Sequence, residues 1–233
     1  MRSIAKLMKD WQFTGPDGVT AAVALPHTWN AMDGQDGGND YWRGACTYCT
    51  GFAAPAFDPA QQQVWLQFEG VNASATVLLN GQQLCTHDGG YSTFRAEVTE
   101  LLQAENQLTV RVDNSVNDRV YPQKADFTFY GGIYRDVSLL VVNKNHIALG
   151  HFGDTGVKIT PALQENSADI QVETLVEGEG TVRVELLDAE GRTVAKGEGE
   201  NTFLHLDAPH LWNGIKDPYL YTCIVRLVKD GQP

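Results

Sequence analysis

The sequence predicts an all-β protein built as two consecutive β-sandwiches, a jelly roll followed by an immunoglobulin-like sandwich. Apolar and polar residues alternate along short segments such as 64–69 and 108–112, which is the pattern of half-buried strands. Turn dipeptides such as Asn80-Gly81 and Glu190-Gly191 separate these segments. Parallel sheets would need helix-length crossovers, which the pattern does not offer, so antiparallel sandwiches or barrels are favoured.

The elements follow one another as strands and turns. In the segment 64–69 we expect one face to carry Val64, Leu66 and Phe68 and the other to carry Trp65, Gln67 and Glu69. The segment 98–102 is predicted to form at most one helical turn. Alternation resumes at 170–176 and 182–186, and a last strand is predicted over 219–228.

The apolar run 137–142 ends in the polar tetrapeptide 143–146, where we place the domain boundary. The predicted domains are residues 1–143 and 144–233. The second is close to the size of about 100 residues that is typical of a seven-stranded immunoglobulin-like sandwich. The first suits a larger jelly roll.

The predicted last strand is followed only by the turn-like residues 229–233. Its sheet would then have an open edge, which proteins usually cover or blunt. This favours the hypothesis that the sequence is cut from a longer polypeptide. The alternative is that the last strand is an edge strand with a solvent-exposed tail.

The charge excludes two classes of partner. Twenty-nine acidic residues against 17 basic ones give a net charge of -12, which repels phosphate backbones and anionic lipid headgroups. We therefore expect neither nucleic acid nor membrane as a partner, and no signal peptide or membrane span is visible in the sequence.

Four cysteines, at positions 46, 49, 85 and 223, are too few and too irregular for a disulfide framework. Reduced thiols and a cytoplasmic location are expected. Cys46 and Cys49 match a CxxC pattern, but in a strand this spacing points the two thiols to opposite faces, which favours structural thiols over a redox pair. We predict no metal bound by this chain and no cofactor.

Several motifs together resemble one enzyme family. They are Leu25-Pro26-His27-Thr28-Trp29-Asn30, Tyr41-Trp42-Arg43-Gly44, Phe68-Glu69-Gly70-Val71, Val77-Leu78-Leu79-Asn80-Gly81, Gly89-Gly90-Tyr91-Ser92-Thr93-Phe94 and, most specific, the segment 126–137 with Asp126 and Gly131-Gly132-Ile133. Their order and spacing resemble the N-terminal region of glycoside hydrolase family 2. That family includes β-galactosidases, β-glucuronidases and β-mannosidases.

The resemblance implies a sugar-binding jelly roll, an immunoglobulin-like domain and then a (β/α)8 barrel that holds two catalytic glutamates. Retaining glycosidases need two carboxyl groups about 5 to 5.5 Å apart. In this family both come from the barrel, so we assign no catalytic residue to this chain and expect it to be inactive alone. Its expected partner is its own C-terminal catalytic barrel.

The resemblance also implies two substrate-binding candidates. Asp126 matches the aspartate that reaches from the first domain into the sugar pocket, where a sodium or magnesium ion is conceivable only in the full-length enzyme. The alternative is that Asp126 caps a loop turn. Asn39 lies in the glycine-rich loop 33–40 and is the second candidate, against the alternative that this loop is only a flexible surface element. Gly131 and Gly132 are expected to permit a positive backbone angle or a close approach.

The main hypothesis is therefore the N-terminal part of a retaining exo-β-glycosidase, with a β-galactosidase that hydrolyses terminal β-galactosides preferred. The same part of a β-glucuronidase or β-mannosidase is the first alternative. A carbohydrate-binding two-domain protein without catalysis is the second. A homo-oligomer is plausible for either.

Overall fold

The computed structural model describes residues 2–33, 42–121, 128–150 and 152–231. These residues are almost entirely strands and turns, with one short 3-10 turn, η1 (Thr99–Leu101), inside the segment predicted to be at most one turn. The all-β prediction is confirmed. The chain divides into two compact units, residues 2–142 and 143–233.

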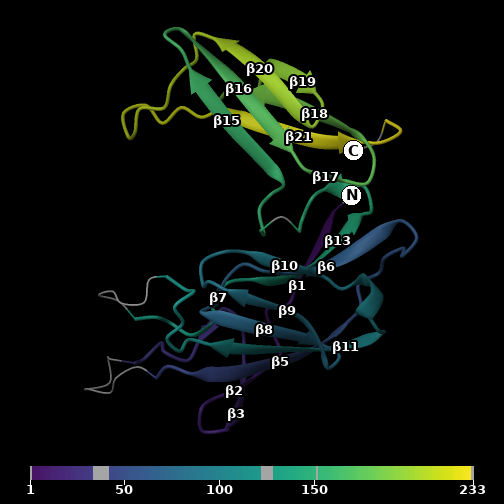
Figure 1. Ribbon diagram of the computed structural model, residues 1–233, viewed down its shortest axis with the longest axis vertical. Helices are drawn as coiled ribbons and strands as arrows, with labels where there is room; N and C mark the ends of the chain where they lie inside the picture. Colours follow the sequence, from purple (N-terminus) through teal and green to yellow (C-terminus); the bar gives the residue numbers. More distant parts are fainter. Residues whose placement is uncertain (1, 34–41, 122–127, 151, 232–233) are drawn as a thin grey trace. The chain divides into compact units, whose positions relative to one another are not determined.

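The first unit is a sandwich of two antiparallel layers (Figure 1). One layer has six strands in the order β3 (Thr20–Val23), β2 (Trp11–Thr14), β5 (Ala45–Ala53), β11 (Glu105–Asp113), β8 (Ser74–Leu79) and β9 (Gln82–Asp88). The other has four, in the order β1 (Ser3–Lys6), β13 (Val137–Asn143), β6 (Gln62–Phe68) and β10 (Phe94–Glu97). A small sheet of β4 (His27–Thr28), β12 (Gly132–Ile133) and β7 (Val71–Asn72) accompanies them.

Alternation along the strands fills the space between the layers. In β5 the residues Cys46, Tyr48 and Thr50 are buried, while those between them are less so. Leu108, Val110 and Val112 of β11 contribute the same kind of row. The buried rows of these strands meet between the layers, and the core of this unit is a single apolar cluster.

One expectation about facing was wrong. Gln67 of β6 was predicted to point outward, yet it is only 8% exposed, as is Trp65 on the same face, so this strand is buried on both faces. Burial of Gln67 is tolerated because its amide is satisfied. Its Oε1 accepts a hydrogen bond from Arg95 Nε at 2.7 Å, and its Nε2 donates to Glu69.

The second unit is also a two-layer sandwich. One sheet has the order β15 (Val157–Leu163), β16 (Ser167–Thr174), β20 (Asn201–Asp207), and the other has the order β19 (Thr193–Glu198), β18 (Thr181–Leu187), β21 (Thr222–Val228). A short pair, β14 (His146–Ile147) and β17 (Val176–Glu177), completes the strands described. Its separate core includes Ile170, Val172, Val184 and Leu204.

Local signals placed the turns well. Asn80 and Gly81 both have positive φ, 52° and 81°, and join β8 to β9 as a two-residue hairpin. The last strand starts at Thr222 rather than Tyr219, since Tyr219 instead stacks on His210. Within the described chain β21 pairs with β18 alone, which leaves its other edge open there.

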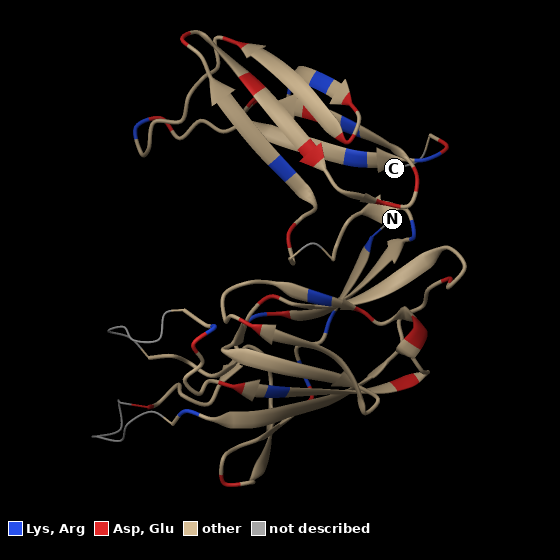
Figure 2. Cartoon of the chain, viewed as in Figure 1, with Lys and Arg blue, Asp and Glu red and all other residues tan. Residues whose placement is uncertain are grey.

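Acidic residues lie at turns and strand ends of both units, with basic residues interspersed among them (Figure 2). No helix in the described part of the chain is long and apolar enough to cross a bilayer.

Candidate functional site

The most connected polar centre of the first unit is built on two asparagines. Asn30 follows β4, and Asn114 follows β11, so the ends of two elements 84 residues apart in sequence meet here. Both side chains are fully buried, at 0% exposure. A buried amide is costly unless its hydrogen bonds are made, so the partners of these two residues are informative.

Every hydrogen-bonding position of the Asn30 amide is used. Its Oδ1 accepts from Gly131 N at 2.7 Å and from Asn114 Nδ2 at 3.2 Å. Its Nδ2 donates to Asp33 Oδ2 at 2.7 Å and to the Trp42 carbonyl oxygen at 2.9 Å. Asp33 Oδ2 also accepts from Trp42 N at 3.1 Å.

Asn114 continues the network in the other direction. Its Nδ2 also donates to the Phe129 carbonyl oxygen at 3.0 Å, and its Oδ1 accepts from Gly44 N at 2.8 Å. Its own carbonyl oxygen accepts from Arg43 Nε at 2.8 Å. The Arg43 guanidinium lies 4.9 Å from the centre of the Phe129 ring, a cation–π contact that holds the same segments together.

This amide network, defined by Asn30 and Asn114 with their partners, holds together described residues that lie next to the intervals 34–41 and 122–127. Asp33 and Trp42 flank residues 34–41, and Phe129 and Gly131 follow residues 122–127. Loops that start from one rigid base can present side chains to one ligand.

The two predicted substrate-binding residues, Asn39 and Asp126, fall within these two intervals. Both lie outside the described residues, so their roles stay predictions. The structure places Asp33 and Trp42 on either side of the first interval, and Phe129 after the second.

Aromatic rings pack around this network. Trp29 stacks on Phe13 at 6.0 Å and meets Trp42 edge to face, also at 6.0 Å. Trp42 and Tyr130 are 37% and 42% exposed, so both present aromatic surface of the kind on which a sugar ring can stack. Trp29 packs against the core of the unit.

Two glycines make this packing possible, as predicted. A Cβ at Gly131 would collide with the Trp29 ring, and Gly132 has φ of 140° and lies against the His27 carbonyl oxygen. His27 itself is a hydrogen-bonded structural residue, with Nδ1 2.7 Å from the Tyr48 hydroxyl. Burial lowers the pKa of His27, which keeps the ring neutral near pH 7.

Metal and thiol chemistry have little support in the part of the chain that the structure covers. No cluster of three histidine, cysteine or carboxylate side chains occurs among the described residues. All four cysteines are free, and burial raises the pKa of Cys46 to about 12, so its thiol stays protonated and unreactive. Cys46 and Cys49 do lie on opposite faces of β5.

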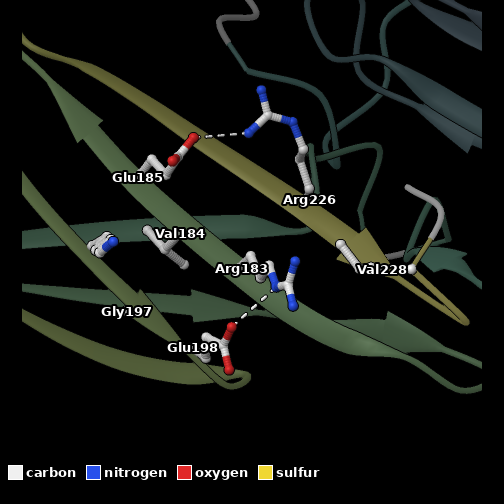
Figure 3. Close-up of a pocket in the computed structure, with 9 residues that line it drawn as sticks. Arg183, Val184, Glu185, Gly197, Glu198, Arg226 and Val228 are labelled. Carbon is white, nitrogen blue, oxygen red and sulfur yellow. Dashed lines mark hydrogen bonds and ion pairs between the residues drawn. The ribbon is translucent and has the colours of Figure 1, made fainter. Parts of the chain in front are cut away.

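Another cavity lies on the second unit, and both of its arginines are already paired. It has a volume of about 680 Å³ on the outer face of β18, β19 and β21. Figure 3 shows Arg183 directed at Glu198 and Arg226 directed at Glu185, with nitrogen–oxygen distances of 3.0 Å for both. A surface whose guanidinium groups bind neighbouring carboxylates offers few free donors to a ligand.

Sequence reasoning did not single out the two asparagines as functional. Asn30 was part of a quoted motif, and Asn114 stands in the Asp-Asn-Ser segment after the strand 105–113. The available signal was an asparagine directly after a buried strand, next to a glycine-rich loop. It is weak, because most such asparagines only form turns.

Comparison with known proteins now gives the family. Residues 38–162 match the family model described as the glycosyl hydrolase 2 galactose-binding domain-like domain, and residues 151–233 match the one described as glycosyl hydrolases family 2. These matches confirm the predicted order of a jelly roll followed by an immunoglobulin-like domain.

Relatives carry both enzyme names. A β-glucuronidase of Bacteroides fragilis is 32% identical over 97% of this chain and 35% of its own length. The crystal structure of an FMN-binding β-glucuronidase from Facaelibacterium prausnitzii L2-6 has a TM-score of 0.92 and 34% identity, over 100% of this chain and 38% of that one. A putative β-galactosidase structure from Bacteroides fragilis has a TM-score of 0.89 and 35% identity, over 99% and 39%.

The chain thus spans little more than a third of the length of these relatives. One family accounts for both matched segments, for the motifs and for the similarity along almost the whole chain. The chain belongs to glycoside hydrolase family 2.

Proposed function

We propose that this chain is the non-catalytic N-terminal part of a retaining exo-β-glycosidase, and that it supports one side of a sugar pocket completed by a catalytic domain. The amide network supports the proposal, because it joins described residues adjacent to both intervals that contain the predicted substrate-binding residues. This chain spans only about a third of the length of its relatives, which supports the assignment of catalysis to another part of the polypeptide.

In this proposal the bond-breaking carboxyl groups belong to the rest of the polypeptide. A retaining enzyme needs a general acid and a nucleophile about 5 to 5.5 Å apart, on either side of the glycosidic bond. The role of the present chain is to hold hydroxyl groups of the terminal sugar through Asp126 and Asn39. Fixed neighbouring residues reduce the conformational entropy that would otherwise be lost when the sugar binds.

The terminal sugar is a β-galactoside or a β-glucuronide. The motifs favoured the galactoside, whereas the names of the relatives support the glucuronide at least equally. A cytoplasmic location and a homo-oligomeric assembly also remain proposals, resting on the sequence alone.

The decisive experiment assays the longer polypeptide that contains this chain against the p-nitrophenyl β-galactoside, β-glucuronide and β-mannoside. We expect turnover of one of the first two, and we expect Asp126→Ala to raise KM strongly. The 233-residue chain alone should give no turnover. Hydrolysis by this chain after removal of host enzymes would contradict the proposal, as would a longer polypeptide inactive on all three substrates.

A further inference from the structure

A second cavity, of about 620 Å³, opens on the outer face of the six-stranded sheet. Its floor comes from two neighbouring strands in register, since Arg111 of β11 lies opposite Thr76 of β8 and Asp113 lies opposite Ser74. These four residues share the outer face because the residues between them, Ala75 and Val112 among others, are buried. We call this cavity the β8–β11 cleft.

One wall of the cleft is the segment 115–119 that follows β11. A compact polar cluster holds this segment against the sheet. Asp88 of β9 accepts hydrogen bonds from Ser74 Oγ at 2.6 Å and from Asn117 Nδ2 at 2.9 Å through Oδ1, and it pairs with Arg119 Nε at 2.7 Å through Oδ2. The Arg119 hydrogen bond lowers the pKa of Asp88, with Ser74 adding to the effect. The wall is therefore preformed rather than a free loop.

The lining of the cleft carries charged side chains of both signs. It has two arginines, Arg111 and Arg119, and two aspartates, Asp113 and Asp118. Arg119 is already bound to Asp88, but Arg111 forms no ion pair or side-chain hydrogen bond among the residues that the structure describes, and it is exposed. Its guanidinium can offer up to five N–H donors to a ligand.

The cavity of Figure 3 differs from the β8–β11 cleft in how its arginines are engaged. There, both arginines on the sheet face bind glutamates of neighbouring strands. In the β8–β11 cleft the Asp113 carboxylate accepts from Ser115 N at 2.8 Å through Oδ1, and Oδ2 has no hydrogen bond among the described residues. A free guanidinium thus stands on the same sheet face as a half-engaged carboxylate.

Such a surface matches a particular ligand chemistry. A group with adjacent hydroxyls can donate to a carboxylate and accept from a guanidinium at once, whereas an anion would meet two aspartates and a cation would meet the free guanidinium of Arg111. The hydroxyls of Ser74, Thr76 and Ser115 add further polar partners, and the 73% exposed Val116 offers an apolar contact for C–H groups. The volume lies within the range of about 300 to 1,000 Å³ of small-molecule sites.

We propose that the β8–β11 cleft binds a neutral saccharide, with Arg111 and Asp113 holding adjacent hydroxyl groups of one sugar ring. This site does not depend on the proposed glycosidase activity. It is complete within the described residues, and it can be tested on the 233-residue chain.

The test is a titration of the 15N-labelled chain with lactose, followed by amide chemical shifts. We expect saturable shifts at Thr76, Arg111, Asp113 and Ser115, and a loss of affinity of about tenfold or more in Arg111→Ala, since hydrogen bonds to a charged group contribute about 1.5 to 3 kcal/mol. Arg183→Ala, which removes an exposed arginine of the second unit, is the matched control and should bind lactose like the parent chain.

Two further arms keep the outcome clear. Thr76→Val removes one hydroxyl with little change in volume and should also weaken binding, while the amide spectrum verifies that each variant is folded. Absence of saturable shifts would overturn the proposal, as would affinity that Asp126→Ala reduces and Arg111→Ala does not, or binding of sodium glucuronate in preference to lactose.

Discussion

At the scale of single residues, the first unit depends on buried amides more than its apolar composition suggests. Asn114 satisfies Gly44 N, the Phe129 carbonyl oxygen and one position of Asn30 Oδ1. Each buried polar group that loses its only partner costs about 1 to 3 kcal/mol. The network is therefore a concentrated source of stability for the first unit.

Asn114→Ala should consequently lower the free energy of unfolding of the first unit by about 2 kcal/mol or more, as measured by urea denaturation. Asn201→Ala is the control, because Asn201 is exposed and its Oδ1 accepts only from Gln171. It should change stability by less than about 0.5 kcal/mol. Equal effects of the two substitutions would show that the buried network is not holding the unit together.

A second prediction at this scale concerns pH. Burial lowers the pKa of His27 below the ordinary value of 6.5, so the folded state binds a proton less readily than the unfolded state. The contribution of neutral His27 to the free energy of unfolding is therefore fully present above pH 6.5. It is lost as pH falls through the lowered pKa of His27 in the folded state. In His27→Asn, urea denaturation between pH 7.5 and 5 should show a shallower decline in stability than in the parent chain.

His205 supplies a control of opposite sign. A hydrogen bond to Asp169 raises its pKa, so its contribution is present below pH 6.5 and is lost as pH rises through the folded pKa. Removal of the exposed His205 should make the free energy of unfolding decline more steeply on acidification. The change should be small, because solvent screens the pair of His205 and Asp169. If both substitutions change the slope in the same direction, the assignment for His27 is wrong.

At the scale of elements, the short strand β12 shows how backbone geometry shapes the site. Gly132 pairs with Thr28 of β4 on one side and with Asn72 of β7 on the other, at φ of 140°. A Cβ there would strike the His27 carbonyl oxygen and come within 2.9 Å of the Tyr48 hydroxyl. This tight approach brings the segments around Asn30 and Gly131 into contact.

Gly132→Ala should therefore destabilise the first unit by about 3 kcal/mol, from backbone strain and overpacking together. Gly51→Ala is the matched control, because Gly51 lies in β5 with an ordinary φ and its nearest contact is the Asn106 carbonyl oxygen at 3.7 Å. It should stay within about 0.5 kcal/mol of the parent chain. Thermal unfolding monitored by circular dichroism separates the two cases, and tolerance of alanine at Gly132 would refute the constraint.

The same elements show what sequence could and could not predict. Alternation and the Asn80-Gly81 turn are local signals, so strands and hairpins were found from them. Burial of Gln67 was missed because it depends on what covers the second face of β6, which no local pattern encodes. The contact of Asn30 with Asn114 joins residues 84 apart, and only the folded sheet brings them together.

At the scale of the whole molecule, the chain has two separate apolar cores. Leu108 belongs to the core of residues 2–142, and Leu204 belongs to the core of residues 143–233. Both leucines are buried, at 0% and 4% exposure. Each core closes on strands of its own unit, so each unit has the means to unfold cooperatively by itself.

We expect two transitions on heating, each sensitive to its own core. Leu108→Ala should lower the midpoint of one transition and Leu204→Ala that of the other, since loss of a buried leucine costs about 2 to 5 kcal/mol. Tryptophan emission identifies them. Four of the five tryptophans lie in residues 2–142, and the fifth, Trp212, is already 64% exposed in the folded chain. The transition that emission follows should therefore be the one shifted by Leu108→Ala, while calorimetry detects both. A single transition shifted equally by either substitution would mean that the two units unfold as one.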